Sequence, residues 1–195
     1  MPNQANGQDA GPLGGKRILI LATHGFEQSE LEVPRDKLRA VGAVVDVVSP
    51  DSGEIMGWEN KDWGRPVKVD KTLAEVRADD YDAIVLPGGQ INPDLLRVNQ
   101  DALDLITAFY RSGKTVAAVC HGPWLLIETG IAKGRKMTSY ASIKTDVINA
   151  GGHWEDAAVV TDNGVITSRN PGDLAAFSAK IIEELREGRH RRQAA

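Results

Sequence analysis

The chain has 195 residues and a formal net charge of −4, with 42% hydrophobic and 26% charged residues, which fits one soluble globular domain. Its single cysteine excludes an intramolecular disulfide and a metal site built from several cysteines. The mild acidity argues against a stable complex with duplex nucleic acid. No run approaches the roughly 18 apolar residues of a membrane helix, and residues 1–15 lack the apolar stretch of a signal peptide. We therefore expect a cytoplasmic protein with a small or peptidic ligand.

The chain begins with a segment that has no hydrophobic periodicity. Residues 1–15 contain four glycines and two prolines, which predicts a disordered leader. The folded domain is expected over residues 16–187, and residues 188–195 form a basic tail that we expect to be solvated.

The domain opens with a strand, a helix and a second strand. Residues 17–23 are a short apolar run, typical of a strand buried on both faces. A helix is predicted over residues 29–41, closed by Gly42, and a second strand over residues 43–49. This βαβ opening predicts a doubly wound, mostly parallel sheet.

Residues 50–71 interrupt that rhythm with glycines, Pro66 and two tryptophans, Trp58 and Trp63. We interpret this segment as a hairpin-like excursion on the surface. Two exposed tryptophans are costly in a monomer, so we expect the segment to pack on a partner.

The alternation of strands and helices returns from residue 82 onwards. The hydrophobic patterns and the turn Asp162-Asn163-Gly164 predict the remaining elements. Strands are expected at residues 82–86, 115–119, 157–161 and 165–168, and helices at residues 100–111, 123–129, 143–150 and 173–186.

Three predicted loops follow the carboxyl ends of strands, where ligands bind in open parallel sheets. They cover residues 23–30, 87–94 and 120–123, and the third contains the only cysteine, Cys120. The run Ala118-Val119-Cys120-His121-Gly122 has the form of a nucleophile elbow. The start of the following helix is expected to stabilise a thiolate and lower the pKa of Cys120. The alternative is a buried, inert cysteine.

Neighbouring residues supply further candidates for a thiol-based site. His121 is a candidate general base, with helix capping as the alternative. The N–H groups of Gly88 and Gly89, together with that of His121, are candidates for an oxyanion hole, with a plain tight turn as the alternative. Glu27 and Glu30 are spaced to lie on one side, although acidic residues are also common at helix starts. The scattered histidines show no metal-ligand spacing, so no metal site is expected.

Several motifs together resemble one known family. They are Gly25-Phe26-Glu27, Glu30-Leu31, Leu86-Pro87-Gly88-Gly89, Ala118-Val119-Cys120-His121-Gly122-Pro123, Gly134-Arg135-Lys136, Thr138-Ser139-Tyr140, Asn149-Ala150-Gly151 and the run from Thr167 to Leu174. From about Lys16 to Leu185 the chain resembles the PfpI-type intracellular proteases of the ThiJ/PfpI superfamily, which share a class I glutamine amidotransferase-like fold. The resemblance implies a flavodoxin-like three-layer α/β sandwich with a mostly parallel central sheet, and a homodimer or higher homo-oligomer.

The same resemblance assigns roles to individual residues. Cys120 is the implied nucleophile, His121 its dyad partner, and Glu30 a protonated acid against the sulfur. Asp94 matches an acid that reaches the histidine from a neighbouring subunit, although it follows Gly89 one residue later than in some relatives. Tyr140 is implied in substrate binding together with Glu27.

The activities implied by the family share one step, attack of a thiolate on a carbonyl-type carbon. The leading hypothesis is a stress-related cysteine hydrolase without a cofactor. Its substrate would be a small carbonyl compound or a glycated group, and a peptide is a close second. The alternative is a redox-sensing or chaperone-like protein whose cysteine is oxidised. A glutamine amidotransferase would need a late His-x-Glu partner and a synthase domain, and no synthase domain is recognised.

Overall fold

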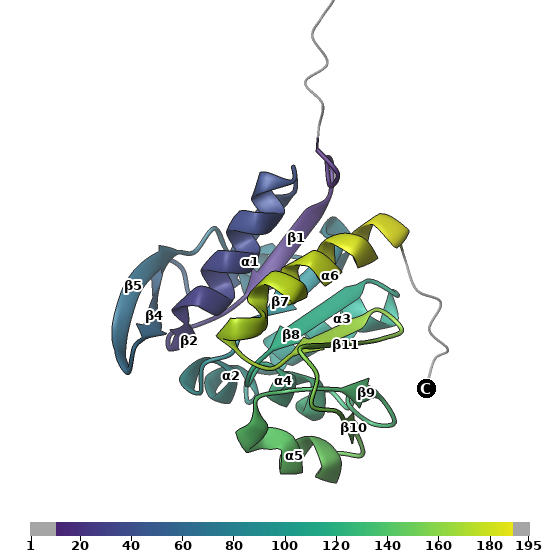
Figure 1. Cartoon of the computed structure of the whole chain (residues 1–195). Coiled ribbons are helices and arrows are strands. Elements are labelled where there is room, and N and C mark those ends of the chain that lie inside the picture. The colour runs from purple at the N-terminus through teal and green to yellow at the C-terminus, as the bar shows by residue number, and fades with distance from the viewer. Residues whose placement is uncertain (1–10, 189–195) are drawn as a thin grey trace, which may run out of the picture.

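The computed structural model describes residues 11–188 and shows a central β-sheet between two layers of helices (Figure 1). Neighbouring strands of this sheet are parallel except for the antiparallel pair at one edge. In order across the sheet, the seven strands formed by the described residues are β11 (Val159–Asp162), β12 (Val165–Ser168), β8 (Thr115–Val119), β7 (Ala83–Leu86), β1 (Arg17–Leu21), β3 (Val44–Ser49) and β6 (Lys71–Thr72).

The central strands are apolar because both faces of the sheet are covered. In β1, Ile18 and Ile20 belong to one hydrophobic core, whereas Leu19 and Leu21 belong to the other. Successive side chains of a strand point to opposite faces, so a continuous apolar run supplies both cores at once.

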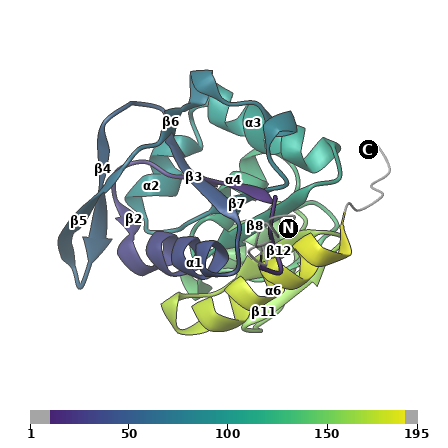
Figure 2. The same ribbon diagram turned by 90° about the horizontal axis from the view of Figure 1, so that it is seen from above.

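Two layers of helices cover the sheet (Figure 2). One layer consists of α1 (Gln28–Ala40) and α6 (Leu174–Glu187), which pack against each other. Residues of α2 (Ile91–Leu96), α3 (Gln100–Arg111), α4 (Pro123–Glu128) and α5 (Lys144–Asn149) belong to the core on the other face. The three-layer α/β sandwich predicted from the sequence is therefore confirmed.

Several local predictions need correction. Residues 11–15 form an ordered turn rather than a disordered leader. Leu13 holds this turn on the domain, since its side chain is buried at 1% exposure and its N–H donates to Val41 O. The remaining residues of the predicted leader, 1–10, and of the basic tail, 189–195, lie outside the described part of the chain. Short elements that the sequence analysis did not predict are α2, β2 (Phe26–Glu27), the edge strand β6, the paired strands β9 (Lys136–Met137) and β10 (His153–Trp154), and 3-10 turns at Leu73–Glu75, Ala78–Asp80, Ala141–Ile143 and Pro171–Asp173.

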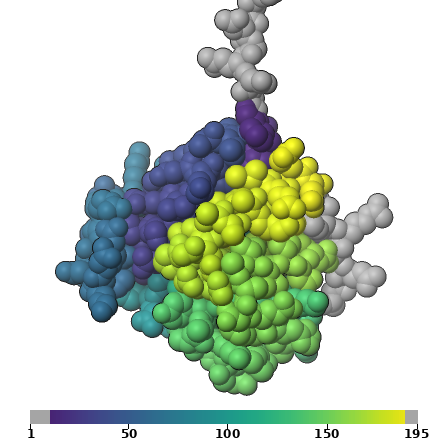
Figure 3. Space-filling view, viewed as in Figure 1, coloured from purple at the N-terminus to yellow at the C-terminus, as the bar shows by residue number. Residues whose placement is uncertain are grey.

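The excursion over residues 50–71 is a hairpin of β4 (Glu54–Glu59) and β5 (Asp62–Lys68) that projects at one side of the molecule (Figure 3). It is attached to α1 because the Arg65 N–H donates to Gln28 Oε1 at 2.9 Å and the Arg65 guanidinium pairs with Glu32 at 2.7 Å. Trp58 and Trp63 meet edge to face, with ring centroids 5.5 Å apart. Trp63 is 52% exposed, whereas Trp58 is half-buried, so only one of the two expected exposed tryptophans is fully exposed.

The order of the strands fixes where a ligand site should lie. The chain moves from β1 to β3 in one direction and later from β7 to β8 in the other, so the order reverses between β1 and β7. A crevice forms beyond the carboxyl ends of the strands at such a reversal. Within residues 11–188, every helix is too short or too polar to cross a bilayer.

Candidate active site

Cys120 lies in the sharp turn that joins β8 to α4. Its φ is 62°, in the left-handed region that non-glycine residues rarely occupy. Backbone hydrogen bonds hold this conformation, because Cys120 N–H donates to Ser168 O at 3.0 Å and Cys120 O accepts from Tyr140 N–H at 2.8 Å. A Cβ atom at Gly122 would lie 2.5 Å from Leu86 O, so a glycine is required there. This geometry is the strained strand-to-helix elbow predicted from the sequence.

Glu30 brings a carboxyl group from the first turn of α1 against the sulfur of Cys120. Its side chain is fully buried, and its Oε2 accepts a hydrogen bond from Gly88 N–H at 2.8 Å. Burial raises the pKa of Glu30 to about 8, although hydrogen bonds from Cys120 and Gly88 oppose this shift. A neutral carboxyl at physiological pH is therefore able to donate a hydrogen bond to the sulfur.

The environment of the cysteine corrects one expectation. Burial raises the pKa of the Cys120 thiol, and negative charge on Glu30 raises it further, whereas the backbone N–H groups of Gly89 and His121 oppose the rise. The expected lowering by a helix start does not prevail, because α4 has only six residues and the sulfur is desolvated. The ionisation of each group depends on the state of the other, so thiol and carboxyl titrate as a pair.

His121 is held on four sides beside the sulfur. Its Nδ1 lies 3.2 Å from Cys120 Sγ, and its Nε2 lies 3.1 Å from Ser142 Oγ. Tyr140 stacks on the imidazole at a centroid distance of 4.9 Å, and Trp124 meets it edge-on at 5.1 Å. Burial lowers the pKa of His121, which favours a neutral imidazole able to accept a proton from the thiol.

The turn Pro87-Gly88-Gly89 packs against Cys120 and His121. The Gly88 N–H donates to Glu30, so it is not available for the oxyanion hole expected from the sequence. The N–H groups of Gly89 and His121 face the sulfur instead. Gly89 has a φ of 75°, and a Cβ there would lie 2.3 Å from Gly25 O. These glycines therefore allow the backbone of the turn to lie close to the neighbouring loops, and they do not serve to make it flexible.

A cavity of about 550 Å³ opens above the sulfur. Burial and the charge of Glu59 raise the pKa of Glu27, whose side chain lies in the cavity wall. The predicted substrate-binding residues Glu27 and Tyr140 both line this cavity. The full lining is Gly25, Glu27, Glu30, Trp58, Gln90, Ile91, Cys120, His121, Tyr140 and Pro171.

Asp94 is the one predicted site residue that the structure does not place with the others. It lies on α2 with an exposed side chain, and the structure records no contact between it and His121. Because the sequence analysis assigned its contact to a neighbouring subunit, that contact stays a prediction.

Three functional side chains were missed from the sequence. The buried amide of Asn92 joins two loops, because its Oδ1 accepts from Thr23 N–H and its Nδ2 donates to Pro87 O and Gly88 O. Trp124 donates to Asp146 Oδ2 at 2.9 Å and packs on His121, and Ser142 meets His121 Nε2. The motif Asn92-Pro93-Asp94 was the only signal for Asn92, whereas no pattern pointed to Ser142 or Trp124.

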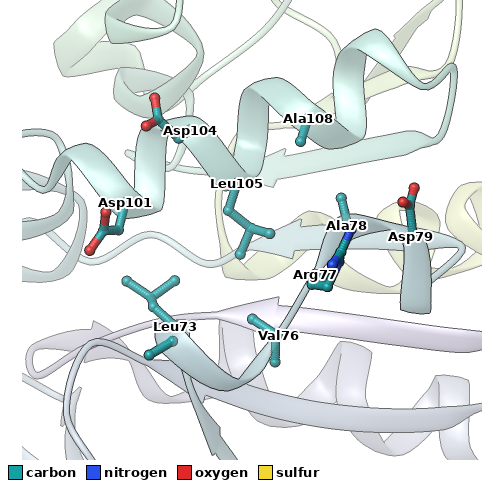
Figure 4. Close-up of a pocket in the computed structure, with 10 residues that line it drawn as sticks. Leu73, Val76, Arg77, Ala78, Asp79, Asp101, Asp104, Leu105 and Ala108 are labelled. Carbon is teal, nitrogen blue, oxygen red and sulfur yellow. The ribbon is translucent and has the colours of Figure 1, made fainter.

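A second hollow, of about 490 Å³, lies between α3 and the 3-10 turns at residues 73–80 (Figure 4). Leu73, Val76 and Leu105 face one another across it. Its remaining lining consists of alanines, three aspartates and Arg77, without a thiol, imidazole or hydroxyl group. The chemistry of the described residues is thus concentrated at the elbow.

Comparison with known proteins agrees with this geometry. Deglycase PfpI of Pyrococcus furiosus is 42% identical over 170 residues, which are 87% of this chain and 99% of that protein. Protein/nucleic acid deglycase 2 of Escherichia coli is 39% identical over 171 residues, which are 87% of this chain and 98% of that protein.

A solved structure from Anabaena variabilis, a two-domain protein with DJ-1/ThiJ/PfpI-like and ferritin-like domains, has a TM-score of 0.83 at 36% identity. The similarity covers 87% of this chain and 48% of that one, so this chain spans about half the length of the two-domain protein. The sequence profile of the DJ-1/PfpI family matches residues 16–184, from the start of β1 to the last turns of α6. This match confirms the resemblance inferred from the motifs, and the chain belongs to the DJ-1/PfpI family.

Proposed function

We propose that this protein is a cysteine-dependent hydrolase that removes carbonyl damage, acting on glyoxal-type adducts or on the free dicarbonyl compound. One observation carries the proposal: Cys120 Sγ lies on a strained elbow, 3.2 Å from His121 Nδ1 and against the Glu30 carboxyl, at the base of a cavity of about 550 Å³. The relatives named as deglycases support the same reaction class.

The chemistry of this site balances without a cofactor. With a methylglyoxal adduct of an amine, Sγ attacks the carbon that carries the nitrogen, a C–S bond forms, the C–N bond breaks, and the amine leaves with the thiol proton. The hydrogen of that carbon then moves to the neighbouring ketone carbon, and the proton of its hydroxyl group moves to the ketone oxygen. The first carbon is thereby oxidised to a thioester carbonyl and the second is reduced to an alcohol. Water then cleaves the C–S bond, releases lactate and restores the thiol.

Each neighbour of the sulfur has a role in these steps. His121 takes the thiol proton through Nδ1 and returns it to the leaving amine. Glu30, protonated because it is buried, donates a hydrogen bond to the sulfur. In its ionised form it is a base that can move the carbon-bound hydrogen as a proton. Such a base needs a pKa near the working pH, which burial provides here.

The size of the cavity favours small adducts over an extended peptide. A volume of about 550 Å³ falls within the range of small-molecule sites, roughly 300–1,000 Å³. Trp58 and Tyr140 supply aromatic walls, and Glu27 supplies an acidic group. A three-carbon adduct with part of its carrier side chain fits these dimensions, whereas a peptidase needs a groove for several residues of extended chain.

The experiment compares wild type with Cys120→Ser and Cys120→Ala after exposure to methylglyoxal. Wild type should show a transient adduct on Cys120 by mass spectrometry and should release lactate, and both variants should lose activity while keeping the fold by circular dichroism. A serine hydroxyl lacks the acidity that the neighbouring base requires. Near-wild-type lactate release by Cys120→Ser would overturn the proposal, and peptide cleavage without lactate would favour a peptidase.

A further inference from the structure

The two ring nitrogens of His121 contact different side chains. Nδ1 lies 3.2 Å from Cys120 Sγ, and Nε2 lies 3.1 Å from Ser142 Oγ. A neutral imidazole carries one N–H group, so the hydrogen bond at one nitrogen determines what the other nitrogen is able to do. The residue that meets Nε2 therefore affects proton transfer at the sulfur.

We propose that Ser142 is a positioning residue whose hydroxyl accepts a hydrogen bond from the Nε2–H of His121 and so leaves Nδ1 to accept the proton of Cys120. This inference rests on the proposed function only in that Cys120 is taken as the reacting group. The hydroxyl oxygen also accepts from the imidazolium that forms after proton transfer, so it stabilises the thiolate–imidazolium pair.

The backbone holds Ser142 at this place. It lies in the 3-10 turn Ala141–Ile143, and the preceding residue, Tyr140, donates its N–H to Cys120 O at 2.8 Å. Ile143 N–H donates back to Tyr140 O at 3.1 Å. The turn that carries Ser142 is thus attached directly to the elbow that carries Cys120 and His121.

The imidazole ring is restrained independently of that hydroxyl. Tyr140 stacks on one face with an interplanar angle of 26°, and Trp124 packs edge-on at 67°. Trp124 is in turn fixed by its hydrogen bond to Asp146. Because packing sets the plane of the ring, the hydroxyl of Ser142 acts mainly on which nitrogen carries the proton.

The charged groups around the ring do not take over this role in the described chain. Glu30 of α1 faces the sulfur, and Glu27 of β2 lies in the cavity wall. Asp146 of α5 acts on His121 through its charge, while its Oδ2 accepts from Trp124. Asp94 of α2 is exposed, with no contact to His121 recorded. Ser142 is therefore the partner of Nε2 within residues 11–188.

The test uses Ser142→Ala, Ser142→Thr and the control Ser52→Ala, an exposed serine between β3 and β4 that does not line the cavity. Cys120 is the sole cysteine, so the difference in absorbance at about 240 nm between each protein and its Cys120→Ala counterpart follows the thiolate once the tyrosinate contribution cancels. Ser142→Ala should raise the apparent pKa of Cys120 by about half a unit to one unit and lower kcat about three- to tenfold, with KM little changed. Ser142→Thr, which keeps the hydroxyl group, should have the wild-type values of the Cys120 pKa and of kcat. Ser52→Ala should change neither value.

Nitrogen-15 NMR of His121 supplies a second readout, which does not depend on activity. The proposal requires the Nε2–H tautomer in the neutral ring and a shift of the tautomer balance in Ser142→Ala. An Nδ1–H tautomer in wild type, or an unchanged thiolate titration in Ser142→Ala, would overturn it. A tautomer that responds to Asp94→Asn but not to Ser142→Ala would also overturn it. If Cys120→Ser keeps hydrolase activity, the proposed function fails, yet these readouts still decide the role of Ser142.

Discussion

The carboxyl of Glu30 and the thiol of Cys120 form the chemical centre of this protein. Burial raises the pKa of both groups, and negative charge on Glu30 raises that of Cys120 further, whereas the hydrogen bond from Cys120 opposes the rise at Glu30. Glu30 therefore keeps a proton at neutral pH that it would lose at the protein surface. Two consequences of this environment can be measured on the free protein, one in its stability and one in its reactivity.

Stability should fall with rising pH because of Glu30. Its pKa is about 8 in the folded chain against an ordinary value of 4.5, so between these values the folded state binds the extra proton. The free energy of unfolding then decreases by up to about 1.4 kcal/mol per pH unit as pH rises through this window. His121, whose pKa is lowered, has the opposite effect as pH rises through about 6.5, and Glu27, whose pKa is raised, acts in the same direction as Glu30. The contribution of Glu30 is therefore the part of the slope that its substitution removes.

Glu30→Gln keeps a hydrogen-bonding side chain but removes the titrating proton. Urea unfolding at several pH values should give a flatter pH dependence for this variant than for wild type. The control is Asp36→Asn, an exposed carboxyl on the same helix, which should leave the slope as it is. A wild-type slope that survives in Glu30→Gln would show that the carboxyl does not hold the proton.

Although burial raises the pKa of its thiol, Cys120 should oxidise under modest peroxide to the sulfenic and then the sulfinic acid, because it lines the cavity and His121 Nδ1, 3.2 Å from Sγ, can accept the thiol proton. The chain has one cysteine, so no intramolecular disulfide can protect the oxidised sulfur. The mass of the peptide that contains Cys120 should increase by about 16 and then about 32 Da, whereas the same peptide from Cys120→Ala should show neither change, which separates the thiol from the three methionines of the chain. An unmodified thiol after such treatment would indicate that desolvation keeps it inert, and it would also remove the redox-sensing alternative.

At the scale of elements, the site depends on how closely α1, the Pro-Gly-Gly turn after β7 and the elbow after β8 approach one another. Gly88 lies where the three meet. A Cβ there would lie 2.6 Å from Glu30 Oε2, 2.7 Å from Cys120 Cβ and 2.9 Å from His121 N. Two of these contacts are with the backbone or Cβ of the elbow, which cannot move aside as a flexible side chain can.

Gly88→Ala should therefore displace Glu30 from the sulfur. We expect a loss of about 1–3 kcal/mol in the free energy of unfolding, and more than a tenfold loss of hydrolase activity as a rough estimate. The matched control is Gly172→Ala, because a Cβ there meets only Asn170 Oδ1, at 3.1 Å. Activity of Gly88→Ala equal to that of the control would show that this close approach is not needed.

At the scale of the whole molecule, apolar side chains remain exposed near the site. Ile91 and Leu95 on α2 and the following Val98 are exposed, and so is Trp63 on the β4–β5 hairpin. Ile91 also lines the cavity, which places this surface beside the site. Exposed apolar surface of this kind is common at subunit contacts.

We predict a homodimer or higher homo-oligomer in which Asp94 of a neighbouring copy contributes to the site. Dilution should then reduce activity at concentrations where circular dichroism shows an unchanged fold. Asp94→Asn should lower activity without lowering the melting temperature, because the side chain is exposed within its own chain. Light scattering that shows a compact monomer with full activity would contradict both parts of this prediction.

The sequence by itself determined the order of the main elements, the sandwich and the elbow. Periodicity and turn residues are local properties, and the positions of β8, α3 and α6 follow from them to within a residue. It also placed Cys120, His121, Glu30 and the two glycines at the carboxyl edge of the sheet, because parallel strands bring their ends to one side.

Only the tertiary structure decided the electrostatics of that edge. Whether a helix start lowers the pKa of a thiol or burial raises it depends on how many groups surround the sulfur, which no local pattern records. Three contacts illustrate this: Gly88 N–H donates to Glu30, Asn92 joins two loops, and Ser142 meets His121. All of them join residues more than three positions apart in sequence, and most join different elements. Such contacts form only when the sheet brings its loops together, so they could not be inferred from the chain one segment at a time.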